Sequence, residues 1–289
     1  MKKSILTFVL FLSTTILYGQ NNPKTILWKV TKEGNQKESF LFGTFHEVSP
    51  SFFLSLPDVV DLLEQSDVLF VEERTAVWQD STVIEQPSWN ARKWNEILNK
   101  QQEKIFADFV KKAEDSSYYK ANPLILSFTT SRLYIMNFCE QEAEFDELMD
   151  TYIEKIAVEK NKQVFSLDSS HRMILKNTYE NFNSLQDSLY ASYSIQAMEN
   201  MLNDDLSGCE MISTYKNFDI DYALDNDITE QSHPLLVERN RKWVQTLDKA
   251  FLSNNCFVAI GFSHLLYQQG LIQRLRQLGY QVTPVPIKG

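Results

Sequence analysis

The chain has 289 residues, of which 43% are hydrophobic and 23% are charged, so it has a globular composition and general disorder is excluded. Its formal charge of −10 at pH 7 argues against a nucleic-acid-binding protein, because such a protein needs a basic face. The three cysteines show no CxxC spacing, which excludes a zinc ribbon and a disulfide scaffold; at most one disulfide can form.

Residues 1–20 have the pattern of an export signal. Lys2 and Lys3 give a positive start, and the residues that follow are apolar or hydroxylated up to Leu17. The stretch is short for a membrane span, which needs about 20 apolar residues; an uncleaved anchor is the alternative. We expect an exported protein, periplasmic or extracellular, with a single domain over residues 21–289 and no membrane span once the signal is removed.

The predicted elements begin with two strands, Thr25–Val30 and Ser39–Phe42, which pair around a turn at Gly34. Leu56–Gln65 has apolar residues at helical spacing, which predicts a helix. Val68–Val71 is a short, continuous apolar run, typical of a strand that is buried on both faces. This first region therefore combines strands with a helix.

The middle of the chain, about residues 75–233, is predicted to be mostly helical, with one convincing strand at Gln163–Leu167. The sequence then returns to alternating elements. In order, these are a helix at Leu235–Leu252, a strand at Cys256–Ile260, a helix at His264–Leu278 and an edge strand at Tyr280–Val285. The pattern favours an α/β (α+β) fold, in which helices flank a mixed β-sheet and a large helical insertion separates its two halves.

A Gly-x-x-His motif occurs twice, at residues 43–46 and 261–264, each time directly after a predicted strand. α/β folds place ligands at the carboxyl ends of strands, glycine permits close backbone approach, and imidazole titrates near neutral pH. We therefore expect the two strands to be neighbours and His46 and His264 to share one site. The alternative is that each histidine only caps its strand through local hydrogen bonds.

Charged residues also follow the buried strands. Glu72 comes directly after Val68–Val71, and a buried acid is costly unless it is solvated, paired or coordinating. By alternation Glu72 should face the site and Glu73 should face away. Asp168 ends its strand in the same way, and Arg239 can orient a carboxylate or hold an oxyanion. The plain alternatives are a strand end at the surface and a solvated helix face.

Several other chemistries have no support in the sequence. His46 and Glu47 do not begin a zinc helix of the HExxH type, because the fifth position is Pro50. The second Gly-x-x-His motif lacks the closing glycine of a GxSxG nucleophile elbow. His171 and His233 have no partner motif, so we expect them to be surface or capping residues.

Three blocks of sequence occur in a characteristic order. They are Gly43–His46, Leu56-Pro57 and Ser66–Glu72; then Leu148–Ile153 and Gln163–Asp168; then Glu238–Asn240, Phe257–Leu265, Gly270-Leu271 and Gly279–Val282. Over nearly all of the mature chain, their order and content resemble the TraB/GumN family, which includes the extracellular Tiki proteins. That family usually has Gly-Leu-Glu where this chain has Ser166-Leu167-Asp168, which leaves the role of Asp168 open.

The resemblance implies a mixed sheet flanked by helices and a site for metal-dependent peptide cleavage. In Tiki proteins two histidines and a glutamate form that site, and the matching positions are His46, His264 and Glu72, with Arg239 nearby. These four are therefore the expected catalytic residues, and the first three are the expected metal ligands. The implied cofactor is a divalent ion, manganese or cobalt, with zinc as a further candidate.

The predicted function is an exported metal-dependent hydrolase of the peptidase class, with water activated between His46, His264 and Glu72. Arg239 is expected to stabilise the tetrahedral oxyanion. The expected partner is a peptide or protein substrate, not a nucleic acid. Two alternatives use the same cleft: a metal-free hydrolase with a histidine as general base, and a non-catalytic protein that binds a peptide or haem.

Overall fold

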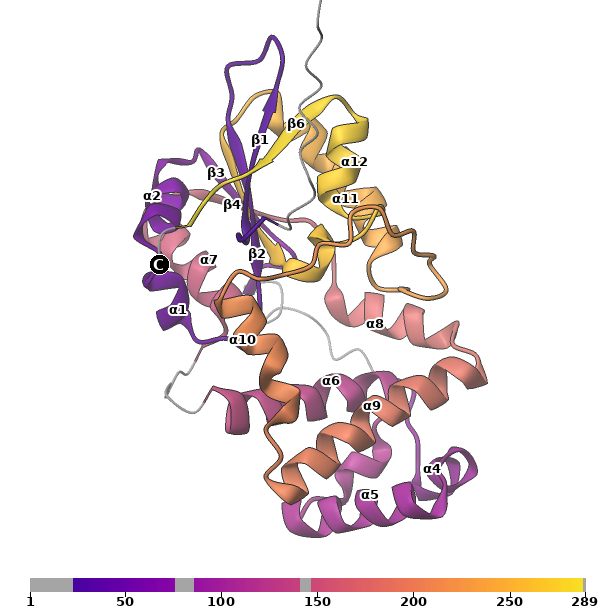
Figure 1. Ribbon diagram of the computed structural model, residues 1–289. Helices are drawn as coiled ribbons and strands as arrows, with labels where there is room; N and C mark the ends of the chain where they lie inside the picture. The colour runs from indigo at the N-terminus through magenta and orange to yellow at the C-terminus, as the bar shows by residue number, and fades with distance from the viewer. Residues whose placement is uncertain (1–22, 76–85, 141–146, 288–289) are drawn as a thin grey trace, which may run out of the picture.

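The computed structural model of the chain describes residues 23–75, 86–140 and 147–287 (Figure 1). The predicted export signal at residues 1–20 lies outside these ranges. Among the helices within them, none is long and apolar enough to cross a membrane.

Six strands form one mixed sheet with the order β4-β3-β5-β2-β1-β6. Strand β1 is antiparallel to both β2 and β6, whereas β2, β5, β3 and β4 run parallel to one another. The predicted α/β fold with a mixed sheet is therefore confirmed, and the last strand lies at an edge as expected. The strands are β1 (Leu27–Lys32), β2 (Ser39–Thr44), β3 (Val68–Val71), β4 (Gln163–Ser166), β5 (Cys256–Gly261) and β6 (Tyr280–Pro284).

The two Gly-x-x-His motifs leave the sheet side by side. Strand β5 lies between β2 and β3, and all six of its residues are buried. Gly43 pairs with Ile260 and Thr44 pairs with Gly261 in a parallel register. The prediction that these two strands are neighbours is confirmed, and the carboxyl ends of β2, β5 and β3 meet at one edge of the sheet.

The helices that pack on the sheet share its hydrophobic core, in which Phe42, Phe257 and Trp243 are fully buried. In Figure 1, α1, α2 and α7 lie on one side of the sheet, and α11 and α12 lie on the other. These helices are α1 (Pro50–Leu54), α2 (Pro57–Gln65), α7 (Met149–Glu159), α10 (Glu210–Lys216), α11 (Val237–Phe251) and α12 (Leu271–Gln277).

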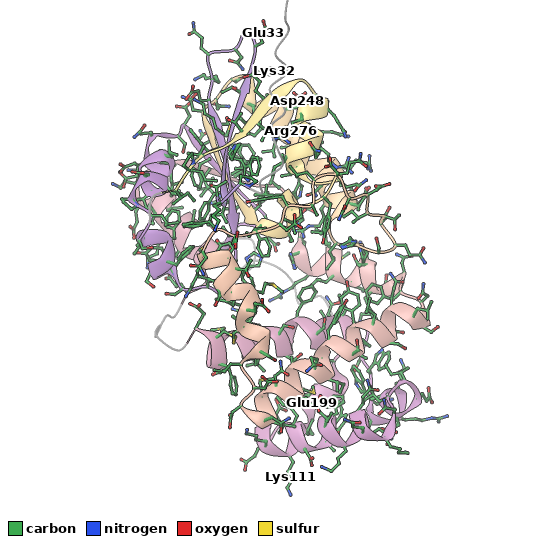
Figure 2. All side chains as sticks on the ribbon, in the orientation of Figure 1. Lys32, Glu33, Lys111, Glu199, Asp248 and Arg276 are labelled. Carbon is green, nitrogen blue, oxygen red and sulfur yellow. A yellow bond between two sulfur atoms is a disulfide. The ribbon has the colours of Figure 1, made fainter. Side chains whose placement is uncertain are left out.

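A second body is helical and has a hydrophobic core of its own, which includes Trp94, Phe106 and Met198. It lies at the opposite end of the molecule from the hairpin of β1 and β2: Figure 2 shows Lys32 and Glu33 at one end and Lys111 at the other. Its helices are α4 (Ala91–Ile97), α5 (Lys100–Ala113), α6 (Pro123–Tyr134) and α9 (Ser184–Asn203), and α8 (His171–Glu180) joins it to the sheet; short helical turns are η1 (Ser116–Lys120), η2 (Ile135–Cys139) and η3 (Ser207–Cys209).

The predicted helix over His264–Leu278 is wrong in its first half. The chain instead forms a short turn, η4 (Phe262–Leu265), and the helix α12 begins only at Leu271. Between them Tyr267 has a positive φ of 69°, and its N–H donates to the carbonyl oxygen of Tyr222 at 2.8 Å. This long-range hydrogen bond replaces the helical one, so the apolar spacing of the segment does not produce a continuous helix.

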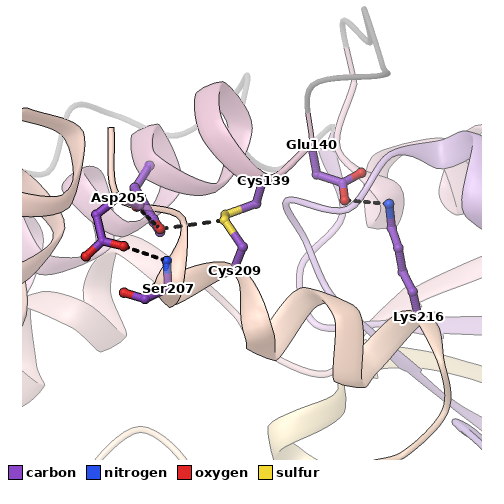
Figure 3. The surroundings of a disulfide bond; sticks show 7 residues. Cys139, Glu140, Asp205, Ser207, Cys209 and Lys216 are labelled. Carbon is purple, nitrogen blue, oxygen red and sulfur yellow. Dashed lines mark hydrogen bonds and ion pairs between the residues drawn. A yellow bond between two sulfur atoms is a disulfide. The ribbon is translucent and has the colours of Figure 1, made fainter. Parts of the chain in front are cut away.

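A disulfide between Cys139 and Cys209 ties the end of η2 to the start of α10, as Figure 3 shows. Next to it, the carboxylate of Glu140 pairs with Lys216 of α10 at 2.5 Å. Cys256 is the free thiol and is buried in β5, in agreement with the limit of one disulfide. The cross-link therefore joins the helical body to the helix that leads back to the sheet.

Candidate functional site

A cavity of about 680 Å³ lies between the strand ends and the helices α6, α8 and α9. All four histidines of the chain, His46, His171, His233 and His264, line this cavity. His171 and His233, expected as surface or capping residues, are partly exposed, and they border the same cavity as the two motif histidines. Glu72 and Arg239 line it as well, so the cavity contains every residue of the predicted site.

Glu72 and Arg239 form a buried ion pair in the cavity wall, with exposed fractions of 8% and 7%. Arg239 Nη2 donates to Glu72 Oε2, and the backbone N–H of Gly261 donates to Glu72 Oε1 at 2.8 Å. Burial raises the pKa of Glu72, but Arg239, His264 and His46 together hold it well below its usual value. Glu72 is therefore an ionised carboxylate at neutral pH.

Asp168 holds Arg239 from the other side. Its Oδ2 accepts from Arg239 Nε at 3.0 Å and from Nη2 at 2.6 Å, and its Oδ1 accepts from Trp243 Nε1 at 2.7 Å. The guanidinium also lies 4.6 Å from the centre of the Trp243 ring. Asp168, whose role the sequence left open, thus fixes the orientation of Arg239 through charge-assisted hydrogen bonds.

His264 is buried and fully engaged by its neighbours. Its Nδ1 is 2.7 Å from the amide oxygen of Asn240, so this nitrogen is assigned the hydrogen. Its Nε2 then accepts from Arg239 Nη1 at 3.1 Å. Burial, and next the charge of Arg239, lower the pKa of His264 to about 3, so the ring is neutral at physiological pH.

His46 has a different environment, because 41% of its side chain is exposed and a carboxylate is its partner. His46 Nδ1 lies 2.5 Å from Asp150 Oδ2, and the hydroxyl of Thr44 donates to Asp150 Oδ1 at 2.6 Å. Burial alone lowers the pKa of His46, but Asp150, with Glu72 and Glu47, raises it to about 10. Asp150 has no role in the sequence prediction, where its only signal is its place in the middle block of the family resemblance.

Because Gly261 has no side chain, space stays open between Glu72, His46 and His264. A methyl carbon on Gly261 would lie 3.0 Å from Glu72 Oε1, 3.7 Å from His46 Nε2 and 3.8 Å from His264 Cδ2. Glu72 Oε1 and His46 Nε2 therefore face one point at the end of β5, whereas His264 presents the ring carbon Cδ2 to it. The absence of a side chain there keeps the point accessible from the cavity.

Glu73 does not face away from the site. It also lines the cavity, and its Oε2 accepts from the backbone N–H of His171 at 3.0 Å. Strand β3 ends at Val71, so the alternation of side chains does not extend to the two glutamates. The expectation for Glu73 was wrong for this reason, and this residue positions the start of α8.

Imidazole nitrogens and carboxylate oxygens are the kinds of donor that bind divalent cations, and Arg239 contacts the same groups. Both motif histidines are anchored through Nδ1 by a side-chain oxygen, an arrangement that orients metal-binding imidazoles. Among the described residues, Glu72, Asp168 and His171 are the group of three whose ligand atoms all lie within 4.8 Å of one another, so of the three predicted ligands only Glu72 belongs to this group. Arg239 donates to Glu72, Asp168 and His264, so a bound cation would compete with this guanidinium.

The fold and the site define an α/β protein in which histidines and a carboxylate paired with an arginine line a cavity at the ends of parallel strands. The chain belongs to the TraB/PrgY/gumN family, whose model matches residues 26–284. The family resemblance is thus confirmed over nearly the whole chain. No curated protein and no solved structure matches it.

Proposed function

We propose that the chain is an exported, metal-dependent hydrolase that cleaves peptide bonds at the centre formed by His46, Glu72 and His264. One observation carries the proposal. Two imidazoles from adjacent strand ends, each anchored through Nδ1, lie beside an ionised carboxylate at the open point at Gly261, which His46 faces with Nε2 and His264 with Cδ2. Histidine nitrogens and a carboxylate suit manganese, cobalt and zinc.

Each residue has a role in this proposal. His46, Glu72 and His264 would hold the ion, which when bound lowers the pKa of a water molecule and polarises a carbonyl. Arg239 borders the cavity, and its positive charge would stabilise negative charge on the substrate oxygen. All five of its N–H groups already have acceptors, so this stabilisation acts through the charge. Asp168 and Trp243 keep that guanidinium in place, so it needs no reorganisation during the reaction.

The cavity supports a peptide as substrate. Its volume of about 680 Å³ falls within the range of sites that enclose drug-sized ligands. The wall opposite the strand ends is apolar, with Phe128 of α6 and Leu189 and Tyr193 of α9. These side chains are 44–51% exposed, so they are free to contact the side chains of a bound peptide.

Two observations support export. Residues 1–20 have the pattern of a signal, and Cys139 and Cys209 form a disulfide, which persists in oxidising compartments outside the cytosol. The periplasm or the cell exterior is therefore the proposed location.

A second candidate, a metal-free hydrolase, is favoured by the position of Arg239. Its guanidinium already supplies a positive charge to Glu72 and Asp168 and donates to His264. In addition, His46 with Asp150 has the arrangement of a general base and its orienting carboxylate. In this candidate the neutral form of His46 removes the proton from water without a metal, so activity would rise with pH toward the raised pKa of His46, about 10.

The test is hydrolysis of a peptide library by residues 21–289, before and after chelation, followed by addition of manganese, cobalt or zinc. We expect chelation to remove activity, metal to restore it, and His46→Ala and His264→Ala to behave like the chelated protein. Asp108→Ala, at an exposed ion pair of α5, is the control and should remain active. Full activity after chelation would favour the metal-free candidate. Absence of hydrolysis under every condition would favour a binding protein.

A further inference from the structure

Asp150 connects two segments that lie far apart in the sequence. It is the second residue of α7 and is separated by 104 positions from His46, whose Nδ1 lies 2.5 Å from its carboxylate. Its other oxygen accepts from the hydroxyl of Thr44 at 2.6 Å. The backbone N–H of Met149 also donates to the carbonyl oxygen of His46 at 3.3 Å. Both the backbone and the ring of His46 are therefore tied to the start of α7.

The two motif histidines differ in what holds their rings. His264 is 2% exposed and lies 4.2 Å from the Trp243 ring, centre to centre, so packing alone restricts its orientation. The side chain of His46 is 41% exposed, and packing restricts it less. Its Nδ1 partner is a carboxylate, whereas the Nδ1 partner of His264 is the neutral amide of Asn240. The hydrogen bond to Asp150 is thus the main restraint on the ring of His46.

Thr44 gives Asp150 a fixed orientation in turn. Because the hydroxyl of Thr44 occupies one carboxylate oxygen, the other oxygen is left for the imidazole. Thr44 is fully buried at the end of β2, two residues before His46. The sheet, the carboxylate and the ring therefore form one chain of contacts that ends at Nε2, which is the nitrogen that faces Gly261.

We propose that Asp150, itself held by Thr44, is the positioning residue that fixes the ring of His46 with Nε2 directed toward Glu72 and Gly261. The inference rests on the proposed function, because a fixed Nε2 matters for activity only when this nitrogen binds a cation or accepts a proton. The loss of such an orienting partner typically costs about 10- to 100-fold in metal affinity or activity.

The experiment compares Asp150→Ala, Asp150→Asn and Thr44→Val with the wild-type chain, and Asp108→Ala is the control. Nitrogen-15 NMR of the four histidine rings reports whether each nitrogen of His46 carries a hydrogen and whether the Nδ1–H is hydrogen-bonded, and His46→Gln assigns its signals. Titration with cobalt, followed by visible absorption, measures metal affinity. Hydrolysis provides kcat and KM where the wild-type chain is active.

We expect Asp150→Ala to remove the acceptor of the hydrogen on His46 Nδ1, so that this hydrogen is no longer hydrogen-bonded there. Cobalt affinity and kcat should fall by about 10- to 100-fold with little change in KM. Asp150→Asn retains an oxygen that accepts from Nδ1, so its loss should be smaller, and Thr44→Val should fall between it and the wild type. Unchanged ring signals and unchanged cobalt affinity in Asp150→Ala would overturn the inference. A wild-type chain that neither binds cobalt nor hydrolyses peptides would instead overturn the proposed function, and the NMR result would still decide the role of Asp150.

Discussion

The first residues of the two Gly-x-x-His motifs, Gly43 and Gly261, are glycines for different structural reasons. Gly261 has φ −50° and ψ 130°, a conformation that any L-residue adopts, so the backbone does not require glycine there. Its value lies in the open space between Glu72 and the two imidazoles. At Gly43 a methyl carbon would lie 2.9 Å from Phe262 Cβ and 3.1 Å from its Cα, so this glycine permits close packing of β2 against η4.

This difference predicts opposite outcomes for two matched substitutions. We expect Gly261→Ala to fold with a smaller loss of stability than Gly43→Ala and to lose at least about tenfold in kcat/KM, or about 1.4 kcal/mol, because the new methyl group crowds Glu72 Oε1. Gly43→Ala should instead lower stability by about 1–3 kcal/mol through overpacking. Thermal unfolding and hydrolysis measure the two effects. A fully active Gly261→Ala would show that the point at Gly261 is not part of the reaction centre.

The sequence indicated some of these residues far better than others. His46, His264 and Glu72 follow strands, and a strand end is visible as an apolar run that stops at a polar residue. Asp150 has no such signal, because an acid in the first turn of a helix is common and its partner lies 104 positions away. His171 was missed because only the tertiary fold brings the start of α8 to the cavity.

At the scale of elements, continuous apolar runs were the reliable signal. Strands β3 and β5 are buried along their whole length, and their predicted limits differ from the observed ones by at most one residue. The failure near Tyr267 has the opposite cause, since its hydrogen bond to Tyr222 is a long-range contact that local periodicity does not report. Local patterns thus predict elements whose hydrogen bonds stay within an element or a sheet.

Asp67 anchors the start of β3 to the segment before β5. Its Oδ2 accepts from the backbone N–H of Asn255 at 2.8 Å, and its own N–H donates to the carbonyl oxygen of Asn255 at 2.7 Å. This hydrogen bond from Asn255 lowers the pKa of Asp67; burial opposes the shift, and Lys37 adds to it. The unfolded chain therefore binds a proton at Asp67 more readily than the folded chain, so the stabilisation is present above the unfolded pKa and is lost as pH falls.

We expect Asp67→Asn to lower the free energy of unfolding by about 1 kcal/mol at pH 7, the typical net value of such a hydrogen bond. The difference from the wild type should begin to shrink below about pH 4, the usual pKa of an aspartate. It should be lost once pH falls through the lowered pKa of folded Asp67, where both chains are neutral at this position. Urea unfolding of both proteins at pH 7, 4 and 3 measures this difference in the free energy of unfolding. A difference that stays constant over this range would assign the effect to packing instead of charge.

At the scale of the whole molecule, the site lies where two bodies with separate cores meet. The strand ends supply His46, Glu72 and His264, and the helical body supplies the apolar wall with Phe128 and Leu189. Neither body contains the cavity alone. The placement of the helical body against the sheet therefore determines the width of the site.

The disulfide between Cys139 and Cys209 closes a loop with a sequence separation of 70, which includes α7, α8 and α9. A cross-link over a loop of this length is worth about 4 kcal/mol in the chain-entropy model, since the unfolded chain loses freedom. The free thiol does not disturb it, because burial raises the pKa of Cys256 to about 11 and leaves little thiolate for exchange near pH 7.

We expect the double variant Cys139→Ser and Cys209→Ser to loosen the helical body first, since α6 and α9 then depend on their own core to stay packed. Hydrogen exchange followed by mass spectrometry should show faster exchange in α5, α6 and α9, and unchanged exchange in β3 and β5. Cys256→Ser is the matched control, because it places a hydroxyl in the buried strand β5 and should speed exchange in the sheet. Equal acceleration in both bodies of the double variant would mean that they unfold as one cooperative unit, and the cavity would then be as stable as the sheet itself.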